Sequence, residues 1–130
     1  MRSLLLIACC CLLSACQAQK LDPPAQRLAG TWTSTFNGAV VDLIAEDDTS
    51  GVYIVQPPTE DRASFTGTFS ATQTRLTIVN DDNGPCPGTE GEYEFAILNG
   101  VMQLTVKSDD CEGRSEGTDY AWTRMFRNSN

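Results

Sequence analysis

Histidine is absent from this chain, and basic residues are scarce. The 130 residues include 17 acidic and 9 basic side chains, which gives a net charge of −8. Without an imidazole, a serine or cysteine nucleophile lacks its usual base and a metal lacks its commonest nitrogen ligand. A surface with so few cations also argues against nucleic acid, because phosphate contacts need basic side chains. We therefore expect a protein without enzyme activity, metal, cofactor or nucleic-acid partner.

No apolar run is long enough to cross a bilayer as a helix, which takes about 20 residues. The longest run, residues 4–13, follows the basic Arg2 and leads toward Cys16. A basic start, a short apolar core and small residues at its end predict a secretory signal peptide. The rest of the chain has room for a single domain.

The four residues that end at Cys16, Leu-Ser-Ala-Cys, resemble a bacterial lipobox. In lipoproteins with this motif the cysteine thiol is acylated and the signal peptide is cut just before it. The resemblance implies a signal peptide over residues 1–15, a lipidated Cys16, and membrane attachment through its acyl chains, palmitate among them. Glutamine rather than aspartate at position 17 implies the outer membrane of the bacterial cell envelope. Ordinary cleavage after Ala18, without a lipid, is the alternative.

Residues 16–26 are polar, contain Pro23 and Pro24, and show no sustained periodicity. A proline pair favours an extended chain, so we expect the lipidated cysteine to be followed by a flexible tether. A docking peptide for a protein partner is the other interpretation. The folded domain is expected over residues 27–126, with a polar tail over residues 127–130.

From Leu28 onward, apolar residues recur with a period of two and turn signals follow every 8 to 14 residues or so. The Asn-Gly pairs at positions 37–38 and 99–100 predict tight hairpins. No convincing apolar stripe at helical spacing occurs, so no C-terminal helix is expected. Eight short strands in sequential order predict an all-β fold, a small antiparallel up-and-down β-barrel, with a two-sheet sandwich as the alternative. The expected strands are residues 30–36, 39–45, 52–55, 64–70, 74–79, 92–97, 102–107 and 118–126.

Only Cys86 and Cys111 remain within the expected domain. If Leu98 faces Val101 in the second hairpin, the two cysteines lie near each other at its open end, about two residues out of register. An exported chain meets an oxidising compartment, so we expect one disulfide, which closes a loop of about 25 residues and contributes about 3.5 kcal/mol. Reactive or metal-binding thiols are the alternative, although two cysteines without histidine make a poor zinc site.

Acidic residues cluster in three predicted turns, at positions 46–48, 81–82 and 109–110. Their spacing does not match a calcium loop, and aspartates in turns commonly cap their own backbone. We therefore expect solvated turns, with adventitious calcium as the alternative. Arg114 follows Asp110 and Glu112 closely, which predicts an exposed local ion pair that contributes about 0–1 kcal/mol.

Arg124 is expected on the inward face of the last strand, between Trp122 and Phe126. A buried arginine is costly unless it is paired or stacked. Because the first and last strands of a closed barrel are neighbours, we expect its guanidinium to stack on Trp32. A frayed last strand with Arg124 in solvent is the alternative.

Gly30 and Trp32 at the start of the first strand, with an arginine on the last, resemble the lipocalin or calycin barrels. In those barrels the tryptophan closes one end and the arginine packs across it, so the resemblance implies barrel closure by Trp32 and Arg124. The second half also resembles small bacterial lipocalin-like secreted proteins. The matching residues are Cys86, Gly91, Tyr93, Leu104, Asp110, Cys111, Arg114 and Trp122.

The interior of an eight-stranded barrel is just wide enough for side chains. We expect it to be filled largely by side chains, with an open end lined by Tyr53, Phe65 and Phe69 as a possible ligand mouth. The side chains expected inside are Trp32, Phe36, Phe65, Phe69, Tyr93, Phe95, Leu104, Tyr120 and Trp122.

The function expected from these features is that of a non-catalytic, monomeric, lipid-anchored envelope lipoprotein that binds a small hydrophobic ligand. Two other functions stay open. One is a barrel of the protease-inhibitor type that acts through residues 17–26, although a lipidated N-terminus would hinder this. The other is a structural envelope protein that docks to a protein partner.

Overall fold

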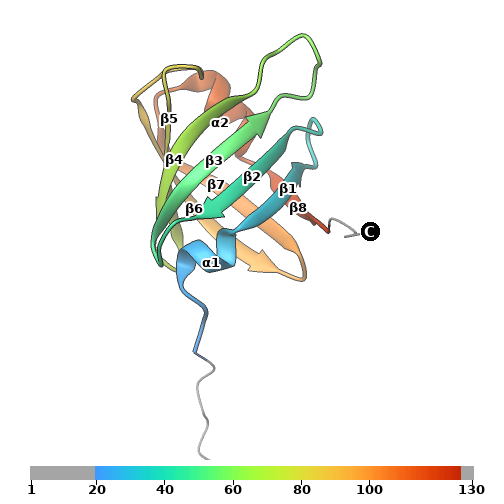
Figure 1. Ribbon diagram of the computed structural model, residues 1–130. Coiled ribbons are helices and arrows are strands. Elements are labelled where there is room, and N and C mark those ends of the chain that lie inside the picture. Colours follow the sequence, from blue (N-terminus) through green and yellow to red (C-terminus); the bar gives the residue numbers. More distant parts are fainter. Residues whose placement is uncertain (1–19, 127–130) are drawn as a thin grey trace, which may run out of the picture.

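The structure, a computed structural model, describes residues 20–126, so the predicted signal peptide and Cys16 lie outside the described residues. Eight antiparallel strands form a closed barrel in which each strand pairs with the next and β8 pairs with β1 (Figure 1). This topology confirms the predicted all-β up-and-down barrel and excludes the sandwich. The strands are β1 (Gly30–Ser34), β2 (Val40–Ala45), β3 (Ser50–Gln56), β4 (Phe65–Ala71), β5 (Arg75–Asn80), β6 (Glu90–Leu98), β7 (Val101–Asp109) and β8 (Ala121–Met125).

The hairpin between β6 and β7 has the predicted register, with Leu98 opposite Val101. Its turn places Asn99 and Gly100 at φ values of 51° and 76°. These left-handed conformations are the ones that a two-residue hairpin turn of this twist requires, and asparagine and glycine adopt them readily. The Asn-Gly signal therefore located this hairpin correctly.

The connection between β1 and β2 is longer than the two-residue hairpin predicted at positions 37–38. β1 ends at Ser34 and β2 begins at Val40. Phe36 consequently leaves the strand: it is 57% exposed, and its ring stacks on that of Tyr120 with the centroids 4.2 Å apart. The prediction that Phe36 and Tyr120 fill the interior is wrong, because the two rings pack against each other instead of joining the core.

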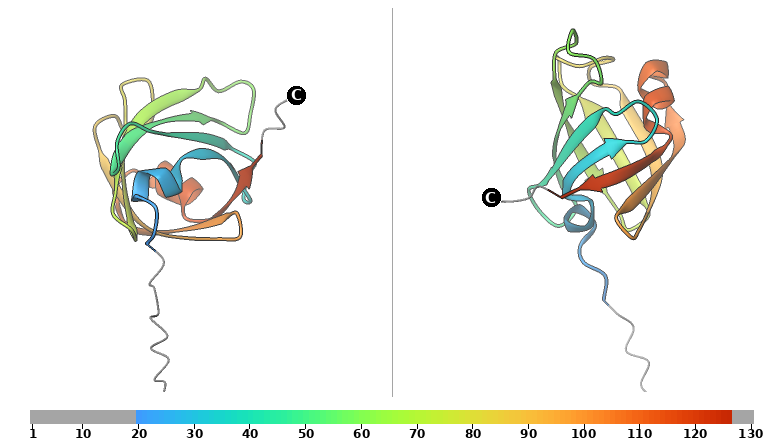
Figure 2. Two further views of the ribbon diagram at one scale, coloured as in Figure 1. Left: turned by 60° about the horizontal axis from the view of Figure 1, so that its bottom comes forward. Right: turned by 90° about the vertical axis from the view of Figure 1, so that its right-hand side faces the viewer.

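A short helix, α1 (Pro24–Leu28), lies across one end of the barrel (Figure 2). Ala25 and Leu28 have no exposed surface, and the N–H of Ala25 donates to the carbonyl oxygen of Asp48 at 3.0 Å. The predicted tether over residues 16–26 is therefore wrong for its last residues. Proline at the first helical position suits a helix start, because its fixed φ is helical and the missing N–H would have no helical partner there. The folded domain begins at Pro24 rather than at residue 27.

A second helix, α2 (Glu112–Thr118), lies between β7 and β8 at the other end of the barrel (Figure 1). It was not predicted, because its seven residues include two glycines and carry no apolar stripe. It also delays the start of the last strand, which runs from Ala121 to Met125 rather than from residue 118. That strand ends before Phe126, which is 81% exposed rather than inward-facing as predicted. Among residues 20–126, neither helix has the length and apolar character needed to cross a membrane.

Candidate ligand-binding site

A cavity of about 560 Å³ lies inside the barrel and opens at the α2 end. Its rim includes Arg62 in the β3–β4 connection, Asn83 in the β5–β6 connection, and Gly113 and Gly117 in α2, whereas no residue of α1 lines it. The interior is therefore less completely filled than the strand number led us to expect. Its wall is mostly apolar and includes Val41, Leu43, Val55, Leu76, Ile78 and Leu104.

Tyr53 and Phe65, two of the three residues predicted at a ligand mouth, line this cavity. Phe69 does not: it is 3% exposed and belongs to the core cluster that also contains Leu28 of α1. Phe69 lies four residues along β4 from Phe65, roughly 13 Å farther from the mouth at the rise of a β-strand. The prediction that Phe69 lines the ligand mouth is therefore wrong, because Phe69 packs between the cavity and the α1 end of the barrel.

Arg114 brings a charged group from α2 to the cavity. Its guanidinium forms a two-point ion pair with Asp109, in which the Nε–Oδ2 and Nη2–Oδ1 distances are both 2.8 Å. Nη2 also donates to the carbonyl oxygen of Thr89 at 2.8 Å. The predicted local ion pair was expected to be exposed, and this is wrong: the side chains of Arg114 and Asp109 are 5% and 0% exposed.

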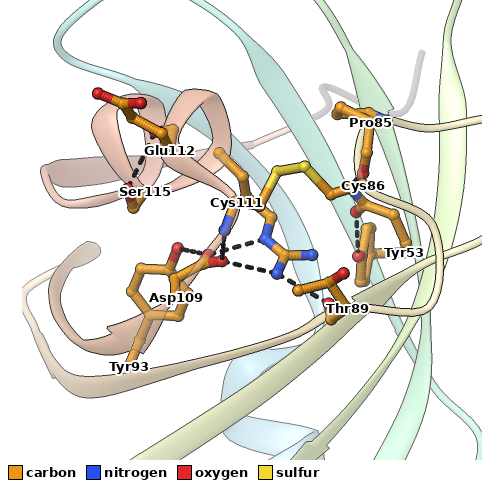
Figure 3. A network of polar contacts seen from close by, with 11 residues as sticks. Tyr53, Pro85, Cys86, Thr89, Tyr93, Asp109, Cys111, Glu112 and Ser115 are labelled. Carbon is orange, nitrogen blue, oxygen red and sulfur yellow. Dashed lines mark hydrogen bonds and ion pairs between the residues drawn. A yellow bond between two sulfur atoms is a disulfide. The ribbon is translucent and has the colours of Figure 1, made fainter.

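Asp109 accepts further hydrogen bonds from the Tyr93 hydroxyl and from the backbone N–H of Cys111 (Figure 3). Burial by itself would raise the pKa of Asp109, but the hydrogen bonds from Arg114, Tyr93 and Cys111 outweigh it and hold the pKa below its usual value. Burial also raises the pKa of Tyr93, which therefore stays a neutral donor. The Asp109 carboxylate is thus ionised and engaged on all sides.

Nη1 of Arg114 is buried and finds no hydrogen-bond partner among residues 20–126. An arginine has five N–H donors, two of them on Nη1, so the guanidinium retains two unused donors. Gly91 makes room for the pair, because a Cβ there would lie 2.5 Å from Asp109 Oδ2 and 3.0 Å from Arg114 Nη2. Since Nε and Nη2 face Asp109 and Thr89, Nη1 is the one guanidinium nitrogen of this cavity-lining residue that is left without a partner.

Tyr53 and Asn80 add a second polar group to the lining. The Tyr53 hydroxyl donates to Asn80 Oδ1 at 2.6 Å, and Asn80 Nδ2 donates to the carbonyl oxygen of Pro85 at 2.6 Å. Burial raises the pKa of Tyr53, and the nearby charge of Arg114 opposes this only in part. Unlike Nη1 of Arg114, these groups already have partners.

The predicted disulfide between Cys86 and Cys111 is present, with the two Cα atoms 5.9 Å apart. It joins the β5–β6 connection to the residue that precedes α2, next to Asp109 (Figure 3). Cys86 has a φ of 49°, a left-handed conformation that is uncommon outside glycine. The disulfide therefore links two parts of the cavity rim and fixes the start of the helix that carries Arg114.

Trp32 and Arg124 close the opposite end of the barrel. They are cross-strand partners in β1 and β8, and the guanidinium carbon of Arg124 lies 4.3 Å from the centroid of the Trp32 ring, which is the predicted stacking. Arg124 donates to the carbonyl oxygens of Ala29 at 2.9 Å and Arg27 at 3.0 Å, while Trp32 Nε1 donates to that of Leu28 at 2.8 Å. These bonds hold the end of α1 and the following turn against the barrel.

Residues 113–117 read Gly-Arg-Ser-Glu-Gly, which matches the Gly-x-Ser-x-Gly pattern of serine hydrolases. In those enzymes the serine lies on a sharp strand-to-helix turn, whereas Ser115 lies within α2. Its Oγ donates to the carbonyl oxygen of Glu112 at 3.0 Å, and the chain has no histidine to activate it. The Gly-x-Ser-x-Gly match therefore does not place Ser115 in the geometry of a catalytic serine.

Sequence reasoning missed Asn80 and the buried state of Arg114. One signal was available for the arginine: it lies three residues after the disulfide-bonded Cys111, a spacing that places both residues on one face of a helix. Comparison of the chain with protein-family models, curated proteins and solved structures finds no significant match. What the site can bind is therefore inferred from its geometry alone.

Proposed function

We propose that this protein is a non-catalytic, lipid-anchored lipoprotein of the bacterial envelope whose lipocalin-like barrel binds a small hydrophobic ligand. The observation that carries the binding function is the cavity of about 560 Å³ with its largely apolar wall. Small-molecule sites commonly measure about 300–1,000 Å³ and combine an apolar lining with a few polar groups. The cavity has this size and this composition.

The place where the N-terminal part of the described chain joins the barrel supports an arrangement in which the cavity mouth faces away from the membrane. The described chain enters the barrel at α1 (Figure 2), whereas the residues that line the cavity place its opening at the α2 end. A lipid on Cys16, upstream of the described residues, would therefore attach the protein by its closed end. A ligand could then enter the mouth without displacing the anchor.

The polar groups around the cavity favour binding over catalysis. Asp109 is the acid closest to Arg114, and its carboxylate already accepts four hydrogen bonds. The Tyr53 hydroxyl is committed to Asn80. A general base needs a free, basic lone pair within reach of its substrate. The Asp109 oxygens have none to spare, and the Tyr53 phenol stays neutral because burial raises its pKa.

A protease-inhibitor function through residues 17–26 is less well supported. Inhibition by that segment would require it to leave the barrel and enter a protease cleft. Its last residues are held in place: Ala25 is fully buried, and Gln73 donates to the carbonyl oxygen of Asp22 at 3.0 Å. Extraction of α1 would also expose Leu28.

Docking to a protein partner is a second candidate function, and one observation favours it. The stacked rings of Phe36 and Tyr120 form a rigid aromatic pair beside the β1–β2 turn, with Phe36 57% exposed. Aromatic residues are enriched where proteins bind one another. A Phe36→Ala variant that loses a co-purifying protein partner but keeps its bound ligand would support partner docking in addition to ligand binding.

Native mass spectrometry of the chain from Gln17 onward, exported to an oxidising periplasm, tests ligand binding. We expect a non-covalent mass on the protein, or uptake of added undecane. Val41→Trp should fill the cavity and abolish uptake, because Val41 lines it. Ile44→Trp is the matched control on the outer face of the same strand, where Ile44 is 46% exposed. Equal uptake by Val41→Trp and the parent chain would contradict binding in the cavity.

A further inference from the structure

The unpartnered nitrogen of Arg114 is the feature of the cavity that the fold itself does not explain. More than nine-tenths of the residue is buried, and its Nη1 has no acceptor among residues 20–126. A buried donor without an acceptor is unfavourable, and more so on a charged group. Because Arg114 lines the cavity, a ligand that offers an oxygen there would remove this penalty.

The charge of Arg114 is already balanced. Asp109 pairs with it through two hydrogen bonds of 2.8 Å, and the pair is shut off from solvent. A carboxylate or phosphate on the ligand would bring a second negative charge next to Asp109 without a second cation to meet it. Burial of an uncompensated charge is strongly unfavourable. The geometry thus suits an acceptor without a charge.

The other polar side chains of the lining either have partners of their own or, like Asn37 and Asn83, are exposed at the rim. The Tyr53 hydroxyl donates to Asn80, and the Asn80 amide donates to Pro85. Arg62, the other cation that lines the cavity, is exposed at its rim. An oxygen on the α2 side of the cavity would therefore meet Nη1 of Arg114 as its donor, while the apolar wall takes the rest of the molecule.

We propose that the ligand is an uncharged apolar molecule with one acceptor oxygen, such as an ester or ketone carbonyl, which binds to Nη1 of Arg114. This inference rests on the proposed ligand-binding function and narrows it to a chemical class. The ion pair with Asp109 positions the guanidinium, and the Cys86–Cys111 disulfide positions the helix that carries it.

Three probes of similar length test the inference on the oxidised chain from Gln17 onward: methyl decanoate, decanoate and undecane. The infrared carbonyl stretch of bound methyl decanoate, which absorbs outside the amide band, should lie below its frequency in hexane, as a hydrogen bond requires. Methyl decanoate should also bind at least about tenfold more tightly than decanoate at pH 7. A hexane-like carbonyl frequency, or equal or tighter binding of decanoate, would overturn the proposal.

Arg114→Lys provides the matched variant. Lysine keeps a cation for Asp109, but its single nitrogen stays at that carboxylate, so no donor takes the position of Nη1. We expect the infrared shift to disappear and the affinity for methyl decanoate to fall about tenfold, with the affinity for undecane unchanged. Arg75→Lys makes the same substitution in an exposed ion pair with Glu92, outside the cavity, and should leave both unchanged. A shift that persists in Arg114→Lys would overturn the assignment to Nη1.

The outcomes separate the two proposals. If neither methyl decanoate nor undecane binds, the ligand-binding function itself fails. If undecane binds and the carbonyl of bound ester stays hexane-like, only the inference about Arg114 fails. If Arg114→Lys does not fold, the infrared spectrum of methyl decanoate bound to the parent protein still tests whether its carbonyl accepts a hydrogen bond, because that measurement needs no variant.

Discussion

Trp32 and Arg124 stand directly opposite each other in β1 and β8, with the guanidinium carbon 4.3 Å from the centroid of the indole. The same guanidinium donates to the carbonyl oxygens of Ala29 and Arg27, and the indole N–H donates to that of Leu28. One pair of side chains therefore contributes both to closure of the barrel and to docking of α1. This concentrates rigidity at one end and leaves the other end available for a cavity.

Trp32→Ala should destabilise the fold by about 3–5 kcal/mol, because a fully buried indole is replaced by a void and the stacked Arg124 loses its partner. The free energy of unfolding in urea measures the effect. Phe126→Ala is the matched control: Phe126 is 81% exposed, so we expect a change within about 0.5 kcal/mol. An unchanged denaturation midpoint for Trp32→Ala would remove Trp32 from the core.

Gly30→Ala should destabilise the fold by about 1–3 kcal/mol. Gly30 has a φ of 139°, and a Cβ there would lie 2.8 Å from Arg124 Nη1. Gly113→Ala makes the same chemical change within α2, where the added Cβ has no neighbour within 4 Å apart from the adjoining residues and the backbone of the helix itself. That variant should stabilise by about 0.5–1 kcal/mol, since alanine favours a helix more than glycine does. Equal effects of the two variants in urea denaturation would contradict the assigned conformations.

The strand pattern could be predicted from the sequence because burial alternates with a period of two. The register of Leu98 with Val101 then located the disulfide, and barrel closure located the contact between Trp32 and Arg124. Both helices escaped prediction for a physical reason. α1 is held by tertiary contacts of Ala25 and Leu28, and α2 starts next to a disulfide-bonded cysteine, so neither needs an apolar stripe of its own.

The cavity could not be predicted, because its existence depends on where a few side chains point. Phe36 was expected to fill the interior, but it lies in a turn and stacks on Tyr120. Arg114 was expected in solvent, yet Gly91 leaves the space in which its pair with Asp109 is buried. The positions of Phe36 and Arg114 differ from the prediction, but neither difference changes the period-two pattern from which the fold was predicted.

Replacement of both Cys86 and Cys111 by serine should cost about 2–4 kcal/mol of stability, because the unfolded chain is no longer constrained by the cross-link. Urea denaturation of the oxidised parent and the double variant measures the difference. Addition of a reductant should destabilise the parent and leave the double variant unaffected. Intact-mass measurement supplies the direct check: a parent chain with the full reduced mass would show that the bond does not form on export.

Cys16→Ser should abolish membrane association if the lipid is attached at this residue. Partitioning of the exported protein between aqueous and detergent phases measures the change, and the variant should move to the aqueous phase. Cys11→Ser is the matched control, since Cys11 lies in the part of the predicted signal peptide that is removed. Detergent-phase partitioning that Cys16→Ser leaves unchanged would refute the lipoprotein assignment.

Asp109→Asn should destabilise the fold by about 3–5 kcal/mol at pH 7, because it leaves the charge of Arg114 buried without its partner. The effect should depend on pH in a defined direction. The pKa of Asp109 is lower in the folded protein than its usual value, which is about 3.9 in an unfolded chain. The stability that its ionised form contributes is therefore complete above pH 4 or so and is lost as the pH falls through the folded-state pKa.

The difference in unfolding free energy between the parent and Asp109→Asn should accordingly shrink from pH 7 to about pH 2, because the parent carboxyl becomes protonated and resembles the amide. Urea titrations at several pH values measure it. Asp110→Asn, at the exposed neighbouring residue, should change the stability by less than about 0.5 kcal/mol at pH 7. A gap between the parent and Asp109→Asn that stays constant over this range would mean that the ionised Asp109 does not stabilise Arg114. The positioning of its guanidinium at the cavity would then need another cause.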